Sequence, residues 1–122
     1  MKILLIDDDV LLRRTVARML LTDGHEVLTA PDGARGMVSF RHDRPDLVIT
    51  DMVMPVQQGC ETILEIRRDD PAVKILAMSG GGRFSGPELL DTARLLGADD
   101  AIEKPFRAEE LLRRVRAFAV PG

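Results

Sequence analysis

The sequence predicts an α/β protein in which a doubly wound, five-stranded parallel sheet is covered by five helices. Short apolar runs, of the kind that form buried strands, alternate along the whole chain with longer segments whose apolar residues recur at helical spacing. This alternation favours a parallel sheet, because right-handed crossover connections place the helices on both of its faces.

The predicted strands are short and almost wholly apolar. The first strand stops at the three aspartates 7–9, which indicates a strand that is buried on both faces and ends at its carboxyl edge. The third strand runs directly into Asp51. The five strands are predicted at residues 3–6, 26–30, 46–50, 74–78 and 101–103.

The predicted helices are bounded by glycine and proline. Gly24 ends the first helix and Gly97 the fourth, while Pro87 begins the fourth. The third helix has arginines in its last turn, where they suit the negative end of the helix dipole. The helices are predicted at residues 10–22, 33–41, 61–68, 87–96 and 108–120.

Composition narrows the class of protein. A chain of 122 residues, 45% hydrophobic and 30% charged, suits a single globular domain over residues 1–122. A net charge of -3 with scattered basic residues argues against nucleic-acid binding by this chain. The single Cys60 excludes an internal disulfide, and the N-terminal apolar run is too short for a membrane span or a signal peptide. We therefore expect a cytoplasmic protein with no membrane partner.

Polar residues follow the strands where a binding crevice is expected. In open parallel sheets, ligands bind beyond the carboxyl ends of the strands. Those ends carry Asp7 and Asp8, then Asp51, Ser79 and Lys104. A doubly wound sheet would bring these five side chains together.

Three close carboxylates need compensating positive charge. A close pair of like charges repels by about 4 kcal/mol at an effective dielectric near 20. Lys104 supplies one cation, and a hard divalent ion with a preference for oxygen ligands, Mg²⁺ or Mn²⁺, would supply the rest. The alternative, that these aspartates only end strands and cap helices, stays open at this point.

Four segments in this order resemble the receiver domain of bacterial two-component response regulators. They are residues 3–9, residues 51–55 followed by Gly59, residues 78–80, and residues 104–106. The resemblance covers the chain from Lys2 to about Ala119. It implies a flavodoxin-like sheet of order 2-1-3-4-5 and a phosphorylation-dependent signalling switch that catalyses only its own phosphotransfer and dephosphorylation.

The resemblance also implies a role for each acidic residue. Asp51 would accept the phosphoryl group from a histidine kinase or a phosphotransfer protein. Asp8 and Asp51 would bind Mg²⁺ directly together with the backbone carbonyl of Val53, and Asp7 would act mainly through metal-bound water.

Further expectations concern the residues around the phosphoacceptor. Lys104 and Ser79 would meet the phosphoryl oxygens, and the Lys104–Pro105 peptide bond would be cis, as it is in this family. Ala101 stands where the family usually has an aromatic residue that reports phosphorylation. The face formed by the fourth helix, the fifth strand and the last helix would bind an effector or a second copy of the chain.

Phosphorylation is expected to act through the segment after the fourth strand. We hypothesise that it draws Ser79 and the glycine-rich loop 80–87 toward Asp51 and shifts the helix that begins near Pro87. The side chains of His25 and His42 are expected to be solvated, as are the arginines near the C-terminus, Arg113, Arg114 and Arg116.

Two other functions stay open. An aspartate-nucleophile phosphatase would use Asp7 with Asp9, but Leu11 stands where such an enzyme would have Thr or Val, and no cap domain encloses a substrate. A receiver-like module that signals by protein contact without phosphorylation is the second alternative, and the missing aromatic at Ala101 is its support.

Overall fold

A five-stranded parallel sheet forms the centre of the computed structural model, which describes residues 1–52, 59–80 and 87–119. The strand order is β2-β1-β3-β4-β5, and every pair of neighbouring strands is parallel. The elements are β1 Lys2–Ile6, α1 Val10–Thr22, β2 Glu26–Ala30, α2 Gly33–Asp43, β3 Leu47–Asp51, α3 Gly59–Asp69, β4 Lys74–Ser79, α4 Glu88–Leu96, β5 Asp100–Glu103 and α5 Ala108–Ala119. The predicted fold class and strand order are confirmed.

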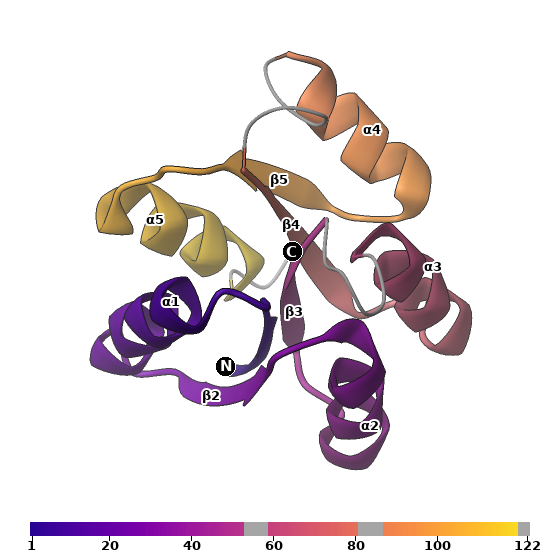
Figure 1. The fold of residues 1–122 in the computed structure, drawn as a ribbon, viewed down its shortest axis with the longest axis horizontal. Helices are drawn as coiled ribbons and strands as arrows, with labels where there is room; N and C mark the ends of the chain where they lie inside the picture. Colours follow the sequence, from indigo (N-terminus) through magenta and orange to yellow (C-terminus); the bar gives the residue numbers. More distant parts are fainter. Residues whose placement is uncertain (53–58, 81–86, 120–122) are drawn as a thin grey trace.

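The helices cover the two faces of the sheet unequally. Figure 1 shows α1 and α5 on one side of the sheet and α2, α3 and α4 on the other. Successive strand residues point to opposite faces, so each strand contributes to two cores. In β1, Ile3 and Leu5 belong to the core beneath α1 and α5, while Leu4 and Ile6 belong to the core beneath the other three helices.

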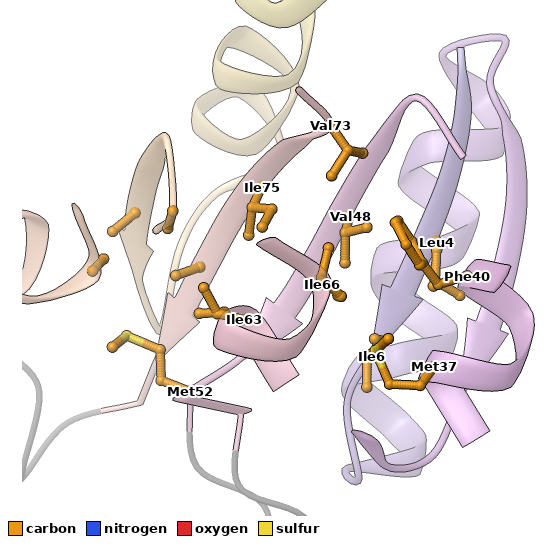
Figure 2. Packing of buried hydrophobic residues seen from close by; sticks show 14 of the residues in the cluster. Leu4, Ile6, Met37, Phe40, Val48, Met52, Ile63, Ile66, Val73 and Ile75 are labelled. Carbon is orange, nitrogen blue, oxygen red and sulfur yellow. The ribbon is translucent and has the colours of Figure 1, made fainter. Parts of the chain in front are cut away.

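The core beneath α2, α3 and α4 is continuous across the sheet (Figure 2). Phe40 and Met37 of α2 point toward Leu4 and Ile6 of β1, and all four side chains are buried. Gly36 lets α2 approach this closely, because a Cβ atom at that position would lie 2.9 Å from Ile6 Cγ1. This packing fixes the position of β1, and so of the residues that follow it.

Some predicted boundaries differ from those of the structure. α2 continues two residues beyond the predicted end, to Asp43, and closes on Arg44 in the left-handed conformation, at φ 48°. The Arg44 guanidinium lies over the Phe40 ring, 5.3 Å from its centroid. That contact joins the left-handed residue to a buried ring one helical turn earlier in the chain.

The strand before the acidic site is also displaced by one residue from its prediction. β3 begins at Leu47 and includes Asp51 as its last residue, so Asp51 is fixed by the sheet ladder. In the part of the chain that the structure describes, no helix is both long enough and apolar enough to cross a membrane.

Candidate functional site

The carboxyl ends of four strands place the predicted site residues at one edge of the sheet. Asp7 follows β1 directly, Asp51 ends β3, Ser79 ends β4 and Lys104 follows β5. The register pairs Asp51 with Met78 and Ser79 with Glu103, so the strand ends are level with one another. Parallel pairing is what brings residues so far apart in sequence to the same edge.

Asp7, Asp8 and Asp51 form an acidic cluster. One carboxylate oxygen from each lies within 4.8 Å of the other two. Asp7 is fully buried, Asp51 is 8% exposed, and Asp8 is exposed. The predicted meeting of the three carboxylates is confirmed.

Lys104 bridges the two buried members of this cluster. Its Nζ atom lies 3.1 Å from Asp7 Oδ2 and 3.2 Å from Asp51 Oδ2, and it donates a hydrogen bond to each. Burial lowers the pKa of the Lys104 ammonium, but the negative charges of Asp51 and Asp7 and the two hydrogen bonds together outweigh burial. The pKa of Lys104 is therefore raised above its ordinary value of 10.5, and the side chain stays charged at neutral pH.

The backbone around Asp7 is held by three hydrogen bonds. The Asp7 amide donates to the Ala30 carbonyl at 3.2 Å, and the Asp7 carbonyl accepts from Arg13 Nη1 at 2.7 Å. The Asp9 amide donates to Asp7 Oδ1 at 2.9 Å. Since Lys104 donates to Oδ2, both carboxylate oxygens of Asp7 have partners within the protein.

Arg13 is a supporting residue that sequence reasoning missed. Its position in the first turn of α1, after the aspartate run, was the available signal. An arginine there can turn back toward the end of β1, but helical spacing alone does not say so.

Ser79 is another buried residue of the site. It is 2% exposed at the end of β4, and its carbonyl accepts a hydrogen bond from the Lys104 amide at 2.6 Å. The Lys104–Pro105 peptide bond is cis, as predicted. Val53, whose carbonyl was predicted to bind metal, lies outside the described residues, as do residues 81–86 of the glycine-rich loop 80–87.

The chemistry of the cluster fits a hard divalent cation. Three carboxylates against one ammonium leave two negative charges uncompensated, and carboxylate oxygens are the ligands that Mg²⁺ prefers. Asp8 makes no hydrogen bond or ion pair with the rest of the described chain. Asp8 is therefore open to a metal, whereas Asp7 is already engaged.

Comparison with known proteins agrees with this geometry. Residues 3–116 match the family model of the response regulator receiver domain. The chain belongs to the response regulator receiver domain family. Membership makes it a signalling domain, and receiver domains generally bind Mg²⁺.

Curated relatives of this receiver domain are longer regulators. The probable transcriptional regulator ycf27 of Galdieria sulphuraria is 39% identical over 118 residues, which cover 94% of this chain and 44% of that protein. The response regulator MprA of Mycobacterium leprae is 36% identical over 122 residues, covering 97% of this chain and 50% of that protein. The receiver domain thus spans about half the length of the curated relatives it matches.

Solved structures show the same fold. The chemotaxis protein CheY4 of Vibrio cholerae has a TM-score of 0.87 at 30% identity, covering 96% of this chain and 97% of that chain. NtrX of Brucella abortus has a TM-score of 0.88 at 32% identity, covering 96% of this chain and 26% of that one.

The face formed by α4, β5 and α5 contains a hollow beside Ala101. Ala101 is 6% exposed on β5, and the hollow has a volume of about 280 Å³. It is lined by Pro87, Leu89, Leu90, Ala101, Glu103, Glu110 and Arg114. The small side chain at position 101 leaves this part of the face concave.

Proposed function

We propose that this receiver domain works as a switch by accepting a phosphoryl group on Asp51. The observation that carries the proposal is the position of the Asp51 carboxylate, which ends a buried strand within hydrogen-bonding distance of Lys104 and inside the acidic cluster. The family gives the general role of a signalling domain, and the geometry supports the choice of residue.

In the proposed reaction, a carboxylate oxygen of Asp51 attacks the phosphorus atom of a phosphohistidine on a kinase or phosphotransfer protein. An O–P bond forms, the P–N bond breaks, and the electron pair returns to the imidazole. Charge stays on the phosphoryl oxygens throughout, so catalysis depends on positioning and electrostatic stabilisation. Lys104, already 3.2 Å from Asp51, provides a fixed cation for those oxygens, and the Ser79 hydroxyl provides a hydrogen-bond donor.

We propose further that Asp8 and Asp51 hold Mg²⁺, or Mn²⁺, with the Val53 carbonyl, and that Asp7 contributes through water. The engaged carboxylate of Asp7 and the open carboxylate of Asp8 support this division. When bound, the cation would offset the negative charge of the cluster and of the incoming phosphoryl group.

The scope of the activity follows from the same site. The proposed domain over residues 1–122 catalyses only its own phosphotransfer and the hydrolysis of its acyl phosphate, which erases the signal. Its location in the cytoplasm remains a prediction. The proposed phosphodonors are histidine kinases and phosphotransfer proteins, and no nucleic acid is proposed as a partner of this domain.

The proposed output face is formed by α4, β5 and α5. Phosphorylation would draw Ser79 toward Asp51 and shift α4, whose first residue, Glu88, follows the glycine-rich loop 80–87. The hollow beside Ala101 lies on this face, so an effector or a second copy of the chain that binds here would contact the segment that moves. Receiver domains usually have an aromatic residue at the position of Ala101. The alanine at this position is therefore the difference from the family that bears most on how phosphorylation would change the output face.

Phosphorylation of the purified chain tests the proposal. We expect incubation with acetyl phosphate and Mg²⁺ to add the mass of one phosphoryl group, measured by intact-mass spectrometry. Asp51→Asn should abolish the addition, and Asp91→Asn, which removes an exposed carboxylate from α4, should leave it intact.

Two results would decide against the proposal. An unmodified wild-type chain that still binds its effector would favour the phosphorylation-independent module. Turnover of a small phosphate ester that survives Asp51→Asn would favour a phosphatase that uses Asp7.

A further inference from the structure

A groove with a basic lining lies between α1 and β2, outside the acidic cluster. Its volume is about 520 Å³. It is lined by Arg13, Arg14, Ala17, Arg18, Leu21 and Thr29, and we call it the basic groove. A hollow of this size falls within the range of about 300–1,000 Å³ that small-molecule sites occupy.

The positive charge of the basic groove is not offset locally. The three arginines are the only charged residues of α1, and no residue that lines the groove is acidic. Arg14 and Arg18 are exposed and form no hydrogen bond or ion pair within the described residues. Glu26, an acidic residue of the adjoining strand, is paired with Lys2 at 3.8 Å. Two free guanidinium groups therefore face one hollow in a chain whose net charge is -3.

Arginine pairs favour phosphate as the ligand. A guanidinium group presents a planar set of donors that matches two phosphate oxygens, and such charge-assisted bonds are stronger than neutral ones. Thr29 adds a hydroxyl group to the lining, and Ala17 and Leu21 add an apolar wall, with Leu21 57% exposed. We propose that the basic groove binds a small molecule that carries two or more adjacent phosphate groups.

Arg13 connects the basic groove with the acidic cluster. It lines the groove and also donates to the Asp7 carbonyl at 2.7 Å. The Asp7 amide bonds to Ala30, the residue after the groove residue Thr29. A polyphosphate in the groove would compete with the Asp7 carbonyl for Arg13. Binding should therefore change the hydrogen bonding of the Asp7 backbone. This role is separate from phosphorylation of Asp51 and does not depend on it.

Calorimetric titration of the 122-residue chain tests the proposal. ATP and pyrophosphate serve as probes, with adenosine as the uncharged control, and EDTA prevents binding through a metal at the acidic cluster. We expect saturable binding of one phosphate probe per chain and none of adenosine. A higher affinity for ATP would indicate a nucleotide whose organic part contacts Leu21, and equal affinities would indicate an inorganic polyphosphate.

A pair of double variants with equal charge change provides the control. Arg14→Gln with Arg18→Gln should weaken binding about tenfold or more, since a hydrogen bond to a charged group contributes about 1.5–3 kcal/mol. Arg94→Gln with Arg113→Gln removes two exposed arginines from α4 and α5 and should leave the affinity unchanged. The amide resonance of Asp7 in ¹H–¹⁵N spectra should shift on binding in the wild type.

Three results would overturn the proposal. One is the absence of saturable binding by both phosphate probes. Another is an equal loss of affinity in the two double variants, which would indicate attraction to overall charge and not to the groove. The third is binding of an acidic peptide such as polyglutamate while both phosphate probes fail, which would make the groove a protein contact.

Discussion

The guanidinium group of Arg67 donates two hydrogen bonds to the carbonyl oxygen of Gly97, at 3.0 Å from Nε and 2.7 Å from Nη2. The same side chain donates to the Val73 carbonyl at 2.6 Å and to Asp99 Oδ2 at 3.0 Å. Arg67 thus joins α3 to the end of α4 and to the segments that precede β4 and β5. Hydrogen bonds from this one residue therefore connect four elements of the fold.

Replacement of Arg67 should destabilise the fold. Arg67→Gln would leave several backbone carbonyls short of a donor, and we expect a loss of about 2 kcal/mol in the free energy of unfolding. Urea denaturation measures it. Arg68→Gln, on the exposed side of the same helix turn, is the matched control and should change stability little. Equal stability of the two variants would contradict the role of Arg67.

Gly97 should not tolerate a side chain. Its φ of 114° lies in the left-handed region, and a Cβ atom would lie 3.2 Å from Arg67 Cγ. We expect Gly97→Ala to lower the free energy of unfolding by about 1–2 kcal/mol. Gly24 also has a positive φ, 90°, but a Cβ atom there would have no neighbour within 4 Å. Gly24→Ala therefore reports backbone strain alone, whereas Gly97→Ala reports strain and the contact with Arg67 together. A larger loss for Gly97→Ala than for Gly24→Ala would measure the contact with Arg67.

Asp8 should destabilise the fold in the absence of a metal ion and should be needed for stabilisation by Mg²⁺. Its carboxylate adds to the repulsion of a cluster that Lys104 only partly compensates. In EDTA, Asp8→Asn should raise the free energy of unfolding by about 1 kcal/mol. In wild type, a Mg²⁺ concentration of about 100 times Kd should stabilise the fold by about 2.7 kcal/mol, and the variant should lose this gain. Thermal melts with and without Mg²⁺ check both effects, and Mg²⁺ stabilisation that survives in the variant would exclude Asp8 as a ligand.

The ion pair between Asp23 and Arg116 should make stability depend on acid pH. The hydrogen bond from Arg116 lowers the pKa of the Asp23 carboxyl group below its ordinary value of 3.8, despite an opposing effect of desolvation. A carboxyl group whose pKa is lower in the folded state stabilises the fold at any pH above its unfolded-state pKa. That contribution is lost as the pH falls through the pKa of the folded state. Wild type should therefore exceed Arg116→Gln in stability at pH 7, and the difference should shrink as the pH falls below 3.8.

Carbon-detected NMR titration measures the pKa of Asp23 directly. The pKa of Asp23 should rise toward 3.8 in Arg116→Gln and remain depressed in Arg113→Gln, a neighbouring arginine for which no ion pair is found within the described residues. The same pKa in both variants would show that Arg116 is not the cause.

Local patterns in the chain were enough to predict the sheet and the acidic site. α1 and β2 have the predicted bounds, because their apolar spacing and the flanking Gly24 act over a few residues. Asp7, Asp51 and Lys104 could be assigned to one edge because parallel strands end at the same side of a sheet. Each of these inferences needs only the order of elements and the hydrophobic period.

Contacts between distant segments could not be predicted in this way. His25 was expected to be solvated, but its side chain is 9% exposed and lies between the N-terminal amine and Asp23, so that prediction is wrong. His42 is 83% exposed, as expected. Arg114 was expected on a solvated helix face, but it donates to Asp100 and to the Ala101 carbonyl.

The difference has a physical cause. Hydrophobic spacing records which face of an element is buried, and every residue of the element contributes to that signal. A hydrogen bond such as that from Arg67 to Gly97, 30 residues apart in the chain, forms only after helices and strands have packed and fixed both groups. Residue type and order therefore specified the architecture and the strand-end site. Which arginines and histidines form hydrogen bonds between distant segments was decided only by the packing of the helices and strands.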